Sequence, residues 1–348
     1  MESNFYRTIG ALAAIGSAAI AVADGKSKNV TENPLWARYS QPKSGELTSF
    51  AWLNMVPLRA LFGGFPVPTQ NPDKATSVQE LLVATGLDNL NSIGLQAGIK
   101  DRSLTSVTMI DAPGERRGLL SLLDQTPITM QDLPPLPQQV SSVMAFSFDL
   151  ERGLNTVYDV AVDLESLLSP DTTNVQSARS MAKDQLGLDL IDDLSSAIGN
   201  VHCVYSDEGQ VTIGLAPIMV SQVKNPEKLN SALNQLFVEL LPQVSNGNAR
   251  TTVTEKNGIK SYNIEIPQTG MGPMISVGDK WMCASILPQP VVAFNLRQSG
   301  ELPVWSIESL PEVTAQIGAF RIRRKPKSVC ECFPSGLPSV YRLLVTIL

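Results

Sequence analysis

The chain has 348 residues, of which 43% are hydrophobic and 17% are charged. This composition is typical of a globular protein with ample core material and excludes a disordered chain. The formal net charge of -6 gives the whole chain no field that would attract nucleic acid, so we expect no nucleic-acid partner.

The first 32 residues form an apolar N-terminal segment. Arg7 precedes a run of small and apolar residues, from Ile9 to Ala23, that ends in Ala-Val-Ala. Such a run is typical of an export signal cleaved before Asp24, and the other interpretation is an alanine-rich helix of the fold. The run is short for a bilayer span, but association with a membrane through residues 1–23 stays an open alternative.

A first α+β unit is predicted from residue 33 to 115. Asn33-Pro34 predicts a helix start, a strand is expected from Leu47 to Asn54, and a short helix ends at Gly63-Gly64. The sequence SVQE, which begins at Ser77, is a capping box for a second helix. Two strands, around residues 93–99 and 105–110, complete the unit.

A Leu/Pro-rich connector follows from residue 116 to 140. Four leucines between 119 and 123 form an apolar cluster, and the prolines after them exclude a regular helix or a central strand. We expect an ordered, extended segment that packs over its own sheet. A partner-binding surface is the alternative, because extended proline-rich segments dock on aromatic grooves.

A second unit is predicted from residue 141 to 218 and a third from 219 to 319. The second contains a strand near residues 144–148, a helix with apolar residues along one face from Leu154 to Leu168, and two further strands. The third opens with a helix capped by Asn225-Pro226. Two hairpins follow, the first turning at Asn257-Gly258, and a last helix is expected near residues 291–296. Residues 320–348 form an atypical tail with six basic residues and one acid.

The order strand, helix, strand, strand therefore recurs about three times. It predicts an α+β fold of antiparallel sheets with helices packed on one face. Two similar stretches mark the repeat: GLDNLNSIG, from Gly86 to Gly94, and GLDLIDDLSSAIG, from Gly187 to Gly199. Because glycine adopts backbone angles that other residues resist, we interpret both stretches as turns of a duplicated unit. The alternative makes Asp88 and Asp189 a pair of catalytic carboxylates.

The sequence offers few residues for chemistry. It contains no phosphate-binding loop, no dinucleotide-binding fingerprint and no nucleophile elbow. His202 is the only histidine, which excludes metal sites built on several histidines. On a strand, His202 and Cys203 point to opposite faces, so we expect a half-buried structural histidine and no Cys-His pair.

Metal ligands are equally sparse. The four cysteines form neither a disulfide framework nor zinc-binding knuckles. Asp189, Asp192 and Asp193 are the best local candidates for an all-carboxylate site, although acids near a helix N-terminus usually complement the helix dipole. We therefore predict no catalytic residue, no cofactor and no metal.

Several strings resemble a known family. RRGLLSLLDQTPITMQDLPPLP, from Arg116 to Pro137, together with NPLWAR, FAWLN, FSFDL and GDKWMCAS, resembles the DUF3352-type family of conserved planctomycete proteins, whose function is unknown. The resemblance covers about residues 33–319 and implies exported proteins of repeated α+β units. It provides no catalytic residues that can be assigned to positions of this chain.

The same resemblance bears on both ends of the chain. In such proteins the alanine-rich helix is internal and follows another strand-rich half. The N-terminal segment is therefore either signal-like or the internal helix of a truncated unit. The tail after Phe320 departs from the family pattern, and we leave open whether it is native or frameshifted.

These observations favour a non-catalytic, exported, periplasmic or envelope-associated protein that binds a partner, such as another envelope protein, through a duplicated scaffold. One alternative is a hydrolase that uses carboxylates without histidine, which predicts acids converging in one deep pocket. Another is a peripheral membrane protein anchored by the N-terminal apolar segment. The positions of Asp88, Asp189, Asp192 and Asp193 distinguish the first two hypotheses.

Overall fold

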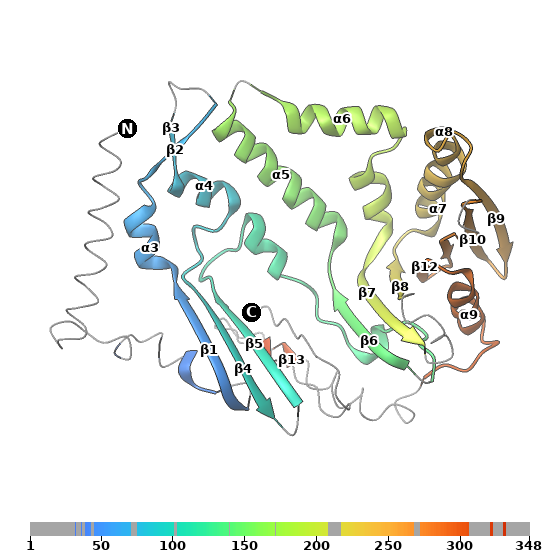
Figure 1. Ribbon diagram of the computed structural model, residues 1–348, viewed down its shortest axis with the longest axis horizontal. Coiled ribbons are helices and arrows are strands. Elements are labelled where there is room, and N and C mark those ends of the chain that lie inside the picture. Colours follow the sequence, from blue (N-terminus) through green and yellow to red (C-terminus); the bar gives the residue numbers. More distant parts are fainter. Residues whose placement is uncertain are drawn as a thin grey trace.

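The computed structural model is a mixed α+β fold with antiparallel sheets, as predicted (Figure 1). It describes residues 45–70, 75–100, 103–138, 140–170, 172–207, 217–267 and 272–305, together with 32, 36, 39–42, 321–322 and 330–331. The apolar N-terminal segment, most of the helix predicted at Asn33-Pro34 and nearly all of the tail lie outside the described residues. Within the part of the chain that is described, no helix is both long and apolar enough to cross a membrane.

The first unit contains a three-stranded antiparallel sheet with the order β1-β4-β5. Its elements are, in chain order, β1 (Glu46–Asn54), α3 (Met55–Phe62), β2 (Pro66–Pro68), β3 (Ala75–Ser77), α4 (Val78–Thr85), β4 (Ser92–Lys100) and β5 (Ser103–Asp111). The predicted capping box is confirmed at the start of α4, where Ser77 and Glu80 exchange hydrogen bonds with each other's backbone.

The connector contains two short 3-10 helices, η2 (Gly118–Leu123) and η3 (Met130–Asp132). Leu136 is fully buried in the core of the larger sheet. The indole N–H of Trp305 donates a 3.2 Å hydrogen bond to the carbonyl of Pro134. The connector therefore packs over its own sheet, which was the structural interpretation of its prolines and leucines.

The larger sheet has seven antiparallel strands in the order β6-β7-β8-β12-β11-β10-β9. They are β6 (Val140–Ser147), β7 (Ile198–Asp207), β8 (Ile218–Val223), β9 (Arg250–Lys256), β10 (Ile259–Glu265), β11 (Met274–Val277) and β12 (Trp281–Ser285). The turn between β9 and β10 has positive φ at Asn257 and Gly258, as predicted. The predicted boundary at residues 218/219 falls at the start of β8, and β7 of the second predicted unit pairs with β8, so the second and third predicted units share one sheet.

The remaining elements are mostly helical. They are α5 (Leu150–Leu168), α6 (Asn174–Leu186), the π-helix η4 (Leu190–Leu194), the 3-10 helix η5 (Ser195–Ala197), α7 (Pro226–Asn234), the π-helix η7 (Gln235–Leu240), α8 (Leu241–Val244), α9 (Pro288–Gln298) and the strand pair β13 (Arg321–Ile322) and β14 (Cys330–Glu331). The sequence did not predict α6, because its residues are mostly polar and none is buried.

Core side chains lie on both faces of the larger sheet. On one face, Cys203 and Cys283 pack with Phe294 of α9. On the other, Tyr262 packs with Leu229 of α7. Because alternate residues of a strand point to opposite faces, the two clusters are separated by the sheet. Helices on a single face, as expected from sequence, therefore describe this sheet only in part.

The strand pairing of the first unit resembles that of β6, β7 and β8. In each case a strand leads through helices to a second strand that pairs with it, and a third strand pairs with the second: β1, β4 and β5, then β6, β7 and β8. The element orders are not identical, because the strand pair β2 and β3 lies between the helices of the first unit alone and β8 extends past residue 218. The third unit differs, because its helices lead into the four-stranded run β9 to β12. Descent of the first two units from one duplicated module stays a prediction.

Candidate functional site

The two predicted turns, Gly86–Gly94 and Gly187–Gly199, are called the first and the second corner below, and they begin with the same backbone geometry. Gly86 ends α4 with φ of 73°, and Gly187 ends α6 with φ of 69°. These left-handed angles favour glycine, because a side chain would crowd the following carbonyl. The interpretation of both glycines as backbone-shaping residues is consistent with this geometry.

Asp88, in the first corner, forms an ion pair with an arginine of the connector. Arg117 Nη2 lies 2.7 Å from Asp88 Oδ2, and the arginine side chain is 53% exposed while the aspartate side chain is 16% exposed. The guanidinium of Arg59 also donates hydrogen bonds to the carbonyls of Asp88 and Leu90. Asp88 therefore helps to fix the turn against the connector.

Asp189, in the second corner, is the N-cap of η4. Its carboxylate accepts hydrogen bonds from the backbone N–H groups of Ile191 (3.0 Å) and Asp192 (3.2 Å), and Arg179 Nη2 lies 2.9 Å away. Burial alone would raise the pKa of Asp189, but these hydrogen bonds and the Arg179 charge outweigh it, so the pKa is lowered. The carboxylate is thus held ionised as a structural cap.

The neighbouring acids serve the same turn. Asp192 lies 3.3 Å from Arg179 Nη2 and its side chain is 62% exposed. Asp193 accepts a 2.8 Å hydrogen bond from the backbone N–H of Asp189. Among the described residues no group of three or more potential ligands could hold a metal ion. Asp88 belongs to a different network from the other three acids, so the structure does not bring the four together.

His202 has both ring nitrogens in use. Nε2 lies 2.9 Å from the carbonyl of Phe148, which can only accept, so Nε2 carries the proton. In the neutral ring, Nδ1 then accepts from the Ser221 hydroxyl at 3.0 Å. The ring also stacks on Phe146 at 5.3 Å. This half-buried histidine links three elements and offers no free nitrogen for catalysis.

Cys203 points away from His202, as the strand alternation predicted. Its side chain is 1% exposed in the core of the larger sheet. Burial raises the pKa of the Cys203 thiol to about 12, so the thiolate needed for nucleophilic chemistry is absent at neutral pH. A catalytic pair of Cys203 with His202 is therefore excluded.

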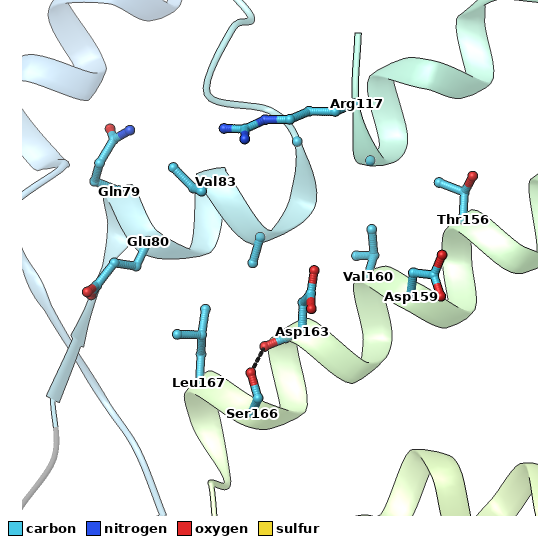
Figure 2. A pocket seen from close by; sticks show the side chains of 13 residues that line it. Gln79, Glu80, Val83, Arg117, Thr156, Asp159, Val160, Asp163, Ser166 and Leu167 are labelled. Atoms are coloured by element: carbon cyan, nitrogen blue, oxygen red, sulfur yellow. Dashed lines mark hydrogen bonds between the residues drawn. The ribbon is translucent and has the colours of Figure 1, made fainter.

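A groove of about 580 Å³ lies between α4, the start of η2 and α5. Figure 2 shows α4 and α5 facing each other across it, with Arg117 above the end of α4. Its volume is within the range of ~300–1,000 Å³ that is common for ligand pockets. Gly86 also lines the groove, so the first corner borders it and the second does not.

The groove has an apolar floor and acidic walls. Val83 of α4 lies across from Val160 and Leu167 of α5 (Figure 2), and Ala84 also lines the groove. The acids are Glu80 on α4 and, on α5, Asp159 and Asp163, which are four residues apart and therefore on one helix face. Arg117 is the one basic residue among the lining residues that the structure describes.

These acids differ in how they are held. Hydrogen bonds from the backbone and side chain of Ser77, and from Thr76, lower the pKa of Glu80, which is engaged in its capping box. Asp159 and Asp163 are exposed, and neither carboxylate has an ion pair or hydrogen bond within the described chain. Their carboxylates can therefore pair with a ligand in the groove.

Sequence reasoning did not single out Asp159, Asp163 or Arg117. The signal for the two aspartates was present, since like charges at i and i+4 on a helix repel and weaken it unless something else compensates. Nothing in the sequence showed that α4, which ends at Thr85, would lie opposite Asp159 and Asp163 of α5.

Comparisons with models of protein families, with curated proteins and with solved structures found no match. The resemblance to the DUF3352-type family stays a prediction.

Proposed function

We propose that the protein acts by binding, without catalysis, and that the groove between α4 and α5 is its binding site. The observation that carries this proposal is the groove itself, with two carboxylates that no described residue engages. In contrast, the acids expected of a histidine-independent hydrolase are committed to a helix cap, an ion pair or a turn. The carboxylate-hydrolase alternative therefore has less support.

Photo-crosslinking from the groove tests the binding proposal. A photoreactive amino acid replaces Ser166, an exposed residue that lines the groove, in the full-length chain. The matched control places it at Thr254, exposed on β9 at the opposite end of the larger sheet (Figure 1). We expect adducts from position 166, none from 254, and their loss when Val83→Trp narrows the groove.

Two results would contradict the proposal. Equal adducts from both positions would indicate nonspecific capture. Absence of adducts from position 166, with turnover of a substrate abolished by Asp163→Asn, would favour an enzyme.

We also propose that the protein is exported or envelope-associated and that its partner is an envelope component. The run from Ile9 to Ala23 and the resemblance to an exported family support this location. Cell fractionation of the full chain, compared with a variant that lacks residues 1–23, tests it. Recovery of the full chain in the cytoplasmic fraction alone would contradict the proposal, and release from the membrane by the deletion would favour the peripheral anchor.

A further inference from the structure

The charge of the groove indicates what it binds. Three acids and one arginine line it, and the arginine is paired with Asp88, which is not among the lining residues. The charge of Arg117 is therefore already compensated, and the negative field of Asp159 and Asp163 remains. A groove with one sign of charge and apolar walls concentrates ligands of the opposite sign.

The spacing of the two aspartates adds a geometric requirement. At positions i and i+4 of α5, their side chains are about 5–6 Å apart at Cβ, and their like charges weaken the helix. Two cationic groups a similar distance apart would pair with both carboxylates and remove this repulsion. Because each pair is exposed to solvent, each contributes only weakly to the affinity.

The apolar residues of the groove favour a ligand that is larger and more apolar than a simple ion. Val83, Val160 and Leu167 offer apolar surface beside the carboxylates. A ligand that covers them must have aliphatic groups as well as charge, as lysine and arginine side chains do. The lining of α5 runs from Thr156 to Leu167, about 17 Å at 1.5 Å per residue. That length accommodates about five extended residues at 3.3 Å each.

We propose that the occupant of the groove is a short basic segment of a partner protein, in which lysine or arginine residues pair with Asp159 and Asp163 and intervening aliphatic residues cover Val83, Val160 and Leu167. This inference rests on the proposed function of the groove. The argument for this occupant is the complementarity of charge and apolar surface.

Fluorescence anisotropy with a defined peptide tests the inference. The probe is a labelled, capped pentapeptide with lysine at positions one, three and five and leucine between them, and the protein is the full chain. We expect saturable binding that weakens as salt rises, because the pairs are exposed. The double variant Asp159→Asn, Asp163→Asn should weaken binding roughly 2- to 30-fold. Val83→Ser should weaken it severalfold.

The matched control removes the same charge elsewhere. Glu227→Gln with Glu255→Gln, both exposed and outside the groove, should leave the affinity unchanged. Circular dichroism confirms that all variants are folded. An equal loss in this control, or equal binding of a pentapeptide with glutamate in place of lysine, would overturn the inference.

Other occupants give distinct results. Competition by spermidine as strong as that by unlabelled peptide would assign the groove to a small polyamine and overturn the peptide proposal. Tighter peptide binding after removal of residues 320–348 would show that the chain's own basic run RIRRKPK fills the groove, which also overturns it. If the peptide does not bind but position 166 still gives specific crosslinks, only the proposal of a basic partner segment is refuted. If the peptide does not bind and position 166 gives no specific crosslinks, the proposed function is refuted as well.

Discussion

The corner at Gly86–Gly94 and the corner at Gly187–Gly199 start alike and then diverge. Each begins with a left-handed glycine that ends a helix, followed by Leu-Asp with the aspartate paired to an arginine. The first then makes a short turn into β4, whereas the second inserts η4 and η5 before β7. The two corners share the backbone geometry of their first glycine, but different elements surround their side chains.

The different surroundings determine how much a substitution at the first glycine of each corner should destabilise the chain. A Cβ on Gly86 would lie 2.1 Å from the backbone oxygen of Arg117, whereas a Cβ on Gly187 would lie 2.2 Å from the side-chain amide of Gln235. The backbone at Arg117 is fixed by the chain on both sides and cannot move away from an added Cβ, whereas the side chain of Gln235 can. The same conformation therefore tolerates substitution very differently in the two corners.

Alanine at the two corner glycines should give the largest contrast. Gly187→Ala strains the folded chain and should lower the free energy of unfolding by about 1–2 kcal/mol, since Gln235 can rotate away by giving up its hydrogen bond to the carbonyl of Leu186. Gly86→Ala adds the same strain and a backbone clash, for a total loss of about 2–5 kcal/mol. Urea denaturation measures both, with Gly300→Ala, at φ of 78° and in open space, reporting strain alone. Equal losses at Gly86 and Gly300 would show that the contact with the connector does not matter.

The closing glycines of the two corners should differ by a smaller amount. A Cβ on Gly94 would lie 2.5 Å from the buried ring of Tyr39, while on Gly199 it would meet the partly exposed side chain of Gln222. We expect Gly94→Ala to destabilise by about 1–3 kcal/mol, because the core must expand, and Gly199→Ala to cost less than half as much. Urea denaturation measures these losses. Adding Tyr39→Phe to Gly94→Ala should not restore the lost stability, because the ring remains. Adding Tyr39→Leu, which removes the ring, should recover part of the loss.

Sequence reasoning succeeded where the signal was local. The capping box at Ser77, the hairpin at Asn257-Gly258 and the amphipathic α5 all depend on residues within one element, and each was predicted. It failed for α6, whose polar residues carry no apolar stripe. The groove depends on α4 meeting α5 across the connector, and no pattern within either helix encodes that contact.

The corner aspartates should give a smaller contrast still. Asp189→Asn keeps the helix cap, because asparagine caps as well as aspartate, but it loses the charged pair with Arg179. The free energy of unfolding should fall by about 1–2 kcal/mol. Asp88→Asn should cost less than about 1 kcal/mol, because Arg117 is exposed and because Asp88 Oδ1 is buried without a hydrogen bond within the described chain. Chemical denaturation at pH 7 compares them, and a larger loss at Asp88 would reverse the assignment of roles.

The smallest expected effect is the dependence of the free energy of unfolding on low pH, which tests the role of Asp189. Its pKa in the folded chain is lowered below the ordinary value of about 3.9 for the unfolded chain. The charged carboxylate therefore contributes its full stabilisation above about pH 4, and that contribution is lost as the pH falls through the lowered pKa. The stability difference between the wild type and Asp189→Asn should accordingly shrink between about pH 4 and pH 2. Carboxylates that contact neither Arg179 nor Asp189 titrate equally in both proteins and cancel in the difference, whereas Asp192 and Asp193 belong to the same network as Asp189. A difference that stays constant over this range would mean that the backbone hydrogen bonds and the Arg179 pair do not lower the pKa of Asp189.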